Sequence, residues 1–370
     1  MRFQIGWSNF LFLLILCVLF FSSCSALNPP PLPTITPRPP TPTSTNRPET
    51  SIEQSHIDQI PMIYDDDGSP DGTTAMFYLL AHPAVDLKVV SLTFGEVNPE
   101  IYIQHLGRQL DAFGFNTIAL GYGERPPHNA LIDFPQFLRD VSDDYWGLPI
   151  PYSDRTYPAQ PAPQLIVDTI NNSPEPITVV VHGPLTNLAA ALQLDPGIKD
   201  NIAAVYIMGG AVYVPGNVHD FYPEDENVYA EWNIVADPPT AKEVFEFGLD
   251  EVYLIPLDAT DLVWINRSDP QQWQQGGQIG DLAGQLYTML MDGWNNAQEA
   301  LIWDLAAAVI MMEPESCEYV HLPLTVVTEV GPTLGQTATV EGGEPNIYVC
   351  LEPDAELIRQ SIIKVFSNHP

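Results

Sequence analysis

Short apolar runs alternate with longer amphipathic segments along most of this chain. The runs are rich in β-branched residues, and we expect strands at 60–64, 87–94, 117–120, 177–181, 203–208 and 251–255. The longer segments have helical spacing, and we expect helices at 73–81, 101–113, 163–171, 185–194 and 240–247. Because apolar strands alternate with helices, the pattern predicts right-handed β-α-β units in a sheet that is buried on both faces. The predicted fold class is α/β, with an open and mostly parallel sheet flanked by helices.

The pattern changes in the last quarter of the chain. Helices are expected at 283–294, 300–312 and 355–366, and β-like segments at 319–327, 337–341 and 346–351. We interpret the β-like segments as C-terminal antiparallel additions that extend or cap the same sheet. The polar and aromatic segment 212–229 is longer than an ordinary connection, so we predict that it forms a loop over a binding site.

The N-terminus, residues 1–24, has the layout of a signal peptide. An unbroken apolar run from Phe10 to Phe21 precedes two serines and Cys24. The run is shorter than the ~20 residues that a transmembrane helix needs. Small residues before a cysteine resemble a bacterial lipobox, so Cys24 is expected to carry lipid. An ordinary secretory signal cut near Ala26 and an uncleaved anchor are the alternatives.

Residues 25–55 are rich in proline and threonine and are predicted to form a linker. Such a composition cannot bury a core and favours extended polyproline II conformations. The linker would hold one folded domain, residues 56–370, away from a membrane. The predicted location is therefore the cell envelope, with an exported domain anchored through its lipid to the outer face of the cytoplasmic membrane.

Charge and cysteine content narrow the possible partners. The formal net charge of −34 gives an anionic surface that repels phosphate backbones, so we expect no nucleic-acid partner. Of the four cysteines, Cys317 and Cys350 lie in the predicted domain. In an oxidising compartment they predict one disulfide, with two buried thiols as the alternative. No CxxC or His/Cys spacing indicates a zinc site.

Acidic and glycine residues follow the expected strands, at the positions where open α/β sheets bind ligands. The first strand leads into Asp65, Asp66 and Asp67, followed by Asp71. Helix capping by Asp71 would explain one of these aspartates, whereas three adjacent carboxylates repel one another without a counter-ion. An EF-hand loop does not fit, because Pro70 stands where that loop needs glycine. We therefore predict a divalent cation, such as Ca²⁺, on hard oxygen ligands.

These residues resemble the inosine/uridine-preferring nucleoside hydrolase family over about residues 58–367. The family signature DxDxxxDD matches Asp65, Asp67 and Asp71 and fails at Gly72. Further matching segments follow in the order of the family at 93–96, 183–187, 208–210, 216–217, 230–233, 237–238 and 303–304. The resemblance implies a Rossmann-related nucleoside hydrolase fold.

The resemblance also implies an activity, which is hydrolysis of the N-glycosidic bond of a ribonucleoside to ribose and free base, with Ca²⁺ as cofactor. Asp67 would bind calcium and act as general base on the attacking water, and Asp304 and the carbonyl of His182 would be further calcium ligands. The residues implied to contact the nucleoside are Asp71, Glu96, Met208, Asn217, Glu231, Trp232, Asn233 and Trp303. Family members are usually dimers or tetramers, so a homo-oligomer is a further expectation.

Three positions depart from the family pattern. Gly72 lacks a carboxylate that the family uses as a calcium ligand, Glu96 replaces an asparagine, and Trp303 replaces the histidine that often protonates the leaving base. One hypothesis is that Glu96 or Asp65 restores the lost ligand, and another is a weaker calcium site. Structural roles are the alternative for single residues, such as capping by Asp304. For the whole chain, the alternative is a non-catalytic nucleoside- or sugar-binding lipoprotein with a degenerate hydrolase site.

Overall fold

The protein is described by a computed structural model that covers residues 59–125, 133–153, 156–157, 160–293 and 296–368. The predicted signal peptide (1–24) and linker (25–55) lie outside the described residues. Within the described ranges, no helix has both the length and the apolar character that crossing a membrane requires.

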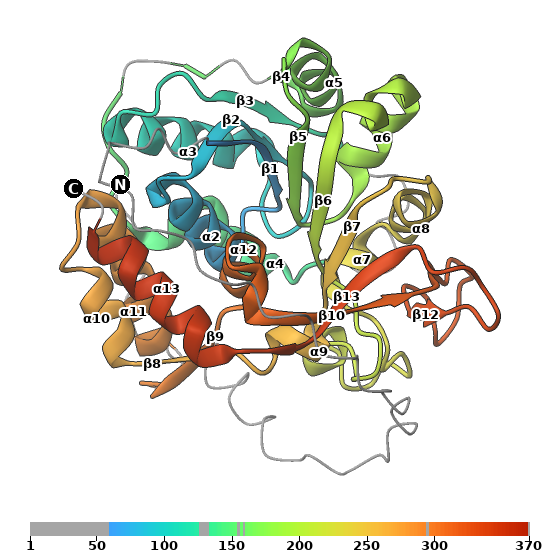
Figure 1. Cartoon of the computed structure of the whole chain (residues 1–370). Coiled ribbons are helices and arrows are strands. Elements are labelled where there is room, and N and C mark those ends of the chain that lie inside the picture. Colours follow the sequence, from blue (N-terminus) through green and yellow to red (C-terminus); the bar gives the residue numbers. More distant parts are fainter. Residues whose placement is uncertain (1–58, 126–132, 154–155, 158–159, 294–295, 369–370) are drawn as a thin grey trace, which may run out of the picture.

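A central sheet of nine strands, counted over the described residues, organises the domain (Figure 1). The strands lie in the order β10 (Cys317–Leu322), β13 (Ile347–Pro353), β7 (Val252–Ile255), β6 (Ile202–Met208), β5 (Ile177–His182), β1 (Ile60–Asp66), β2 (Val85–Leu92), β3 (Ala119–Tyr122) and β4 (Gln160–Pro161). Every neighbouring pair is parallel except β10 with β13. The predicted α/β class with a mostly parallel sheet is confirmed.

The antiparallel part is smaller than the sequence suggested. Strand β13 runs parallel to β7, so the segment 346–351 is part of the parallel sheet and only β10 extends it in the antiparallel sense. Two short antiparallel pairs lie outside the main sheet, and they are β11 (Leu324–Val326) with β12 (Thr337–Thr339), and β8 (Trp264–Asn266) with β9 (Glu299–Leu301).

Helices cover both faces of the sheet (Figure 1). On one face lie α5 (Ala162–Asn172), α6 (Thr186–Leu194) and α8 (Pro238–Glu246), and on the other lie α2 (Pro70–Ala81), α3 (Pro99–Phe113), α12 (Trp303–Met312) and α13 (Ala355–Asn368). Helices α10 (Ser268–Trp273) and α11 (Gln278–Gly293) pack outside the second group. In β1, Met62 and Tyr64 face the α2 side and Ile63 faces the α5 side, all fully buried. A strand covered on both faces has no polar face, which explains its continuous apolar sequence.

Several short elements were not predicted. They include the helices α4 (Gln136–Asp143), α7 (Trp232–Ala236) and α9 (Leu257–Thr260). The predicted loop 212–229 contains a 3₁₀ turn at Val218–Asp220. The two carboxylate oxygens of Asp258 accept hydrogen bonds from the backbone amides of Val212 and Tyr213, each 2.8 Å long, so this loop begins at an ordered point.

Cys317 and Cys350 form a disulfide, with their Cα atoms 5.9 Å apart. This confirms the predicted pairing. The bond joins the edge strand β10 to its neighbour β13. It closes a loop of 33 residues, for which chain entropy alone predicts a stabilisation of about 3–4 kcal/mol.

The strand order of the sheet reverses at β1. Strands β2, β3 and β4 follow on one side of β1, whereas β5 and β6 lie on the other side. In open α/β sheets, ligands bind beyond the carboxyl ends of the strands at such a reversal. Asp66, the last residue of β1, is the register partner of His182, the last residue of β5. The predicted acidic turn therefore stands at the reversal.

Candidate active site

The acidic turn after β1 is buried and lies against the start of α12. Asp65 is fully buried, Asp66 and Asp67 are each 3% exposed, and Asp71 and Asp304 are each 6% exposed. The hydroxyl of Ser69 caps α2 by accepting a hydrogen bond from the amide of Gly72, and it donates one to Oδ2 of Asp304 (3.0 Å). Burial, followed by the charges of Asp71, Asp66 and Asp67, raises the pKa of Asp304 well above its usual value. The structure thus places Asp67 and Asp304 in one cluster.

Asp71 connects the two helices of this cluster. Its Oδ2 accepts a hydrogen bond from the backbone amide of Asp304 (2.6 Å), and its Oδ1 accepts one from the hydroxyl of Tyr287. The N-cap residue of α12 is Ile302, which has no side-chain acceptor, so Asp71 takes over that capping role. Asp71 therefore caps α12 rather than its own helix. Its contact with a ribose hydroxyl stays a prediction.

Asp65 lies on the other side of the turn and links three elements. Its Oδ1 accepts hydrogen bonds from the hydroxyl of Ser91 on β2 and from the side-chain amide of Asn187 on α6 (2.8 Å). Its Oδ2 has no hydrogen-bond partner. Burial raises the pKa of Asp65 to about 7. The predicted role of Asp65 as a metal ligand is untested, and one of its two oxygens already serves a structural purpose.

Asp67, the predicted general base, is held by backbone amides. Its Oδ1 accepts from the amide of Ser69 and its Oδ2 from the amide of Glu96, both at 3.2 Å. Burial raises its pKa to about 7, the charge of Glu231 adds to this, and the charge of Arg139 opposes it. A carboxylate with a pKa near neutrality can accept a proton from water and release it again at physiological pH.

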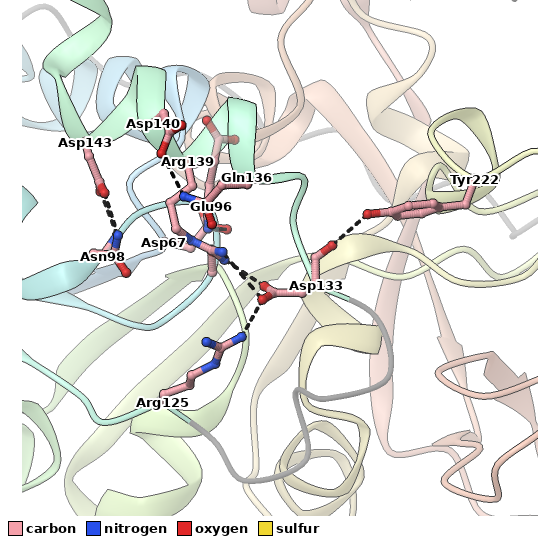
Figure 2. A network of polar contacts seen from close by, with 11 residues as sticks. Asp67, Glu96, Asn98, Arg125, Asp133, Gln136, Arg139, Asp140, Asp143 and Tyr222 are labelled. Carbon is pink, nitrogen blue, oxygen red and sulfur yellow. Dashed lines mark hydrogen bonds and ion pairs between the residues drawn. The ribbon is translucent and has the colours of Figure 1, made fainter.

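Glu96 lies beside Asp67, and Figure 2 shows both next to the side chain of Arg139. Burial, followed by the charge of Asp67, raises the pKa of Glu96 to about 8. One oxygen of Glu96 accepts a hydrogen bond from the hydroxyl of Ser142 on α4. Glu96 is thus a carboxyl group held against a second carboxyl group.

Sequence analysis did not identify Arg139. This residue of α4 is 4% exposed and donates a hydrogen bond to the carbonyl of Gly95 (2.7 Å). It also forms an ion pair with Asp133 (2.7 Å; Figure 2). Its guanidinium group lies 4.9 Å from the ring centre of Phe94. Its position supplies positive charge next to Asp67 and Glu96. The one sequence signal was the scarcity of cationic residues, 13 Lys and Arg against 47 acids.

Glu231, Asn233 and Met208 meet at the end of β6. The carboxylate of Glu231 caps α7 by accepting hydrogen bonds from the amides of Asn233 (3.0 Å) and Ile234 (3.2 Å), and it also accepts one from the amide of Gly210 (2.7 Å). The side-chain amide of Asn233 donates to the carbonyl of Met208 (3.0 Å). Three residues implied to hold the nucleoside therefore converge, although each also has a structural partner.

Aromatic residues extend this side of the site. The ring of Trp232 stacks on Phe134, with centroids 4.4 Å apart and planes at 23°. The side-chain oxygen of Asn217 accepts a hydrogen bond from the amide of Trp232 (3.3 Å). The indole nitrogen of Trp303 donates to Oδ1 of Asp261 (2.8 Å), and burial raises the pKa of that carboxyl. Sequence analysis missed Phe134 and Asp261, which belong to no matching motif.

The ring of His182 is fixed by Tyr64. The tyrosine hydroxyl donates its proton to the carbonyl of Gly72 (2.7 Å) and lies 3.0 Å from Nδ1 of His182. Because the Tyr64 proton is used on Gly72, Nδ1 of His182 must carry the hydrogen of its own contact with Tyr64. Burial lowers the pKa of His182 to about 3, so the ring is neutral. This leaves its backbone carbonyl as the group predicted to face a cation.

The oxygen atoms of the acidic cluster and the carbonyl of His182 are ligands of the kind that a hard divalent cation prefers. Among the described residues, no group of three or more His, Cys, Asp and Glu side chains stands already arranged around one point. However, Oδ1 of Asp66 is buried without a hydrogen-bond partner, and it belongs to the same cluster of repelling carboxylates as Asp67 and Asp304. A cation would give this oxygen a partner and would offset the repulsion between the carboxylates.

Comparison with known proteins gives consistent matches along the domain. The model of the family described as inosine-uridine preferring nucleoside hydrolase matches residues 62–360. The pyrimidine-specific ribonucleoside hydrolase RihA of Citrobacter koseri is 27% identical over 308 residues, covering 80% of this chain and 95% of the relative. The solved structure of a purine-preferring ribonucleoside hydrolase from Gardnerella vaginalis superposes with a TM-score of 0.72 at 24% identity, covering 83% of this chain and 98% of that one. An inosine-uridine preferring nucleoside hydrolase from Bacillus anthracis gives a TM-score of 0.68 at 24% identity, with coverages of 84% and 99%.

Proposed function

Because the chain belongs to the inosine-uridine preferring nucleoside hydrolase family, whose members hydrolyse N-glycosyl bonds, we propose that it converts ribonucleosides to ribose and free base in a calcium-dependent reaction. The observation that carries this proposal is the buried cluster of Asp67 and Asp304 at the reversal of the strand order. Two acids that are 237 positions apart have no packing reason to share a desolvated pocket, and burying them together is costly without a ligand.

The residues divide the work as follows. Calcium, when bound by Asp67, Asp304 and the carbonyl of His182, would lower the pKa of a water on it. Asp67 accepts the proton of the attacking water, and its pKa of about 7 suits that task near neutral pH. The surrounding carboxylates favour the positive charge that develops on the sugar in an oxocarbenium-like transition state.

The polar residues at the end of β6 orient the sugar in this proposal. Glu231, Asn233 and Asn217 hold the ribose hydroxyls, and Met208 packs against the ribose ring. Glu231 is 2% exposed and Asn233 is 8% exposed, so their contacts with a sugar would be shielded from water. Trp232 and Trp303 supply apolar faces for the base. The names of the relatives include pyrimidine-specific and purine-preferring hydrolases, so the base remains to be measured.

A direct assay tests the activity. Purified protein is incubated with a panel of purine and pyrimidine nucleosides, with calcium or with a chelator, and free ribose is measured. We expect ribose release that requires calcium. No release from any nucleoside, together with measurable nucleoside binding, would overturn the enzyme proposal and support a non-catalytic binding protein, the function favoured by the departures at Gly72 and Trp303.

We also propose the location and assembly expected from the sequence, an exported domain held to the outer face of the cytoplasmic membrane by lipid on Cys24, as a homo-oligomer. Cys24, and not Cys17, is the proposed site of lipid attachment, because only Cys24 follows the small residues of a lipobox-like segment. Expression of Cys24→Ser should move the protein from the membrane fraction to the soluble fraction. Light scattering on the purified domain would give its oligomeric state.

A further inference from the structure

We infer that Asp66 replaces the carboxylate that residue 72 lacks, and that Asp66 binds the divalent cation together with Asp67 and Asp304. This inference deepens the proposed function and rests on it for the identity of the site. Asp66 is outside the residues that match the family signature, and sequence analysis assigned it no role. Three observations carry the inference.

The first observation is that Asp66 fills the space of a side chain at position 72. A β-carbon built on Gly72 would lie 2.0 Å from Oδ1 of Asp66 and 2.8 Å from its Cγ. Real β-carbons essentially never come closer than 3.0 Å to another heavy atom of this kind. Glycine at 72 and aspartate at 66 are therefore a matched pair, in which one residue gives up the volume that the other occupies. The carboxylate has moved along the chain but has kept its place in the cluster.

The second observation is an unused oxygen. Oδ2 of Asp66 accepts a hydrogen bond from the amide of Gly68 (3.1 Å), whereas Oδ1 has no partner and the residue is 3% exposed. A buried carboxylate oxygen without a partner is costly, and buried polar atoms in native proteins are rarely left in this state. Oδ1 is the same atom that approaches position 72, so the unpartnered oxygen is the one directed at the lost ligand position.

The third observation is the charge around it. The hydroxyl oxygen of Ser69 lies 3.0 Å from the β-carbon built on Gly72 and donates to Asp304, so Asp304 is linked through Ser69 to the same position that Asp66 approaches. The charge of Asp67 acts on Asp66, and the charge of Asp66 acts on Asp304. The ion pairs found among the described residues include none of these three acids. A bound divalent cation would provide the positive charge that they lack.

A purely structural role is the competing explanation for Asp66, because the hydrogen bond from Gly68 could by itself stabilise the turn. Asparagine separates the two roles. Its side-chain oxygen can accept the same hydrogen bond and has the same shape, but it carries no negative charge. The variant Asp66→Asn should therefore keep the fold and lose affinity for the cation.

The experiment measures calcium binding by titration calorimetry and by terbium luminescence, so that it does not depend on turnover. We expect Asp66→Asn to weaken calcium binding by at least about 10- to 100-fold, the usual cost of losing a residue that only supports a metal ligand. Gly72→Asp alone should be destabilised, because two carboxylates would share one volume. The double variant Asp66→Ser with Gly72→Asp should recover calcium affinity, since it returns the acid to position 72. Asp269→Asn is the matched control, because Asp269 is a buried aspartate that pairs with Arg359 away from the site.

The outcomes separate this inference from the proposed function. If wild-type protein binds calcium and Asp66→Asn binds it equally well, the role of Asp66 is overturned while the hydrolase proposal stands. If the double variant recovers calcium binding but neither the wild-type protein nor the double variant releases ribose, the role of Asp66 is supported and the hydrolase proposal fails. If wild-type protein binds neither calcium, magnesium nor manganese, the inference is wrong, and ribose release measured in parallel reports on the activity independently.

Discussion

The carboxylate of Asp71 accepts a hydrogen bond from the backbone amide of Asp304, 2.6 Å away, across 233 residues of sequence. The contact fixes the first turn of α12 against the first turn of α2. Asp71 therefore positions Asp304, and it can do so without binding a cation itself. We therefore expect a change at Asp71 to alter both the stability of the fold and the position of Asp304.

Replacing Asp71 should destabilise the fold. Asp71→Ala removes the acceptor that caps α12, and loss of a cap costs about 1–2 kcal/mol of unfolding free energy. Tyr287→Phe removes only the hydroxyl that donates to Asp71, so its cost should be smaller. Urea unfolding followed by circular dichroism measures both. An unchanged midpoint for Asp71→Ala would show that water replaces the cap.

Asp67→Asn should remove turnover and leave the fold intact. Asparagine keeps an oxygen for one of the backbone amides that hold Asp67, but it cannot accept a proton from water. The value of kcat should fall by about 10²- to 10⁴-fold, the usual contribution of a general base. Ribose release measures the effect, and thermal unfolding is the control for folding. Turnover within about threefold of wild type would exclude Asp67 as the base.

Without calcium, stability should fall as pH rises. Burial raises the pKa of Asp71 to about 6, that of Asp67 to about 7 and that of Glu96 to about 8. Between the ordinary carboxyl pKa and these values, the folded protein retains protons that the unfolded chain has released. The folded state then binds more protons, and raising the pH through this window lowers the unfolding free energy.

Scanning calorimetry in chelator at about pH 5 and about pH 8 measures this dependence. We expect a lower Tm at the higher pH in chelator, and a larger calcium-induced increase in Tm there, because calcium binds the ionised carboxylates. A Tm that is independent of pH in chelator would show that the acids are ionised in the folded protein without calcium.

Trp303→His should accelerate the reaction if departure of the base limits it. A histidine at this position could donate to Asp261, as the indole does, and the nearby carboxylate would favour its protonated form. The value of kcat should rise by about 10- to 100-fold, the lower part of the range for general acid catalysis. Trp303→Phe is the matched control, because it removes the indole N–H without adding an acid. A histidine variant no faster than the phenylalanine variant would contradict the prediction.

Removing the disulfide should lower stability without affecting the site. Cys317 and Cys350 join β10 to β13 at one edge of the sheet, whereas the acids lie beyond β1 and β5. The double variant Cys317→Ser with Cys350→Ser should lose about 3–4 kcal/mol of unfolding free energy. Denaturant unfolding measures this loss, and calcium affinity in the folded variant should match that of wild type.

The sequence predicted the parallel sheet well because its strands are buried on both faces, so β1 and β5 are continuous apolar runs. The acidic turn was also recognisable, since Asp65 to Asp67 are adjacent in the chain. What each aspartate faces could not be predicted. Asp65 turns to Ser91 and Asn187, whereas Asp66 turns to Gly72, because successive strand residues point to opposite sides.

The hypothesis that Glu96 or Asp65 restores the lost ligand rested on residue type, because the sequence does not show where each side chain points. In the structure, one oxygen of Glu96 accepts a hydrogen bond from Ser142. Asp65 has one oxygen that is shared by two donors and one oxygen without a partner, but only Asp66 places its unpartnered oxygen at position 72. Arg139 was missed for a similar reason. The helix α4 that carries it is amphipathic but has only 8 residues and belongs to no matching motif, and only the folded chain brings Arg139 beside Asp67.

The direction of β1 determines how the domain would face its surroundings. Its seven residues run from Ile60 at one rim of the sheet to Asp66 at the other, a span of about 20 Å. Whatever precedes Ile60 joins the domain at the rim opposite the acids. The proposed lipid tether would therefore attach to the domain on the side away from the acids, so the tether itself would not cover the site.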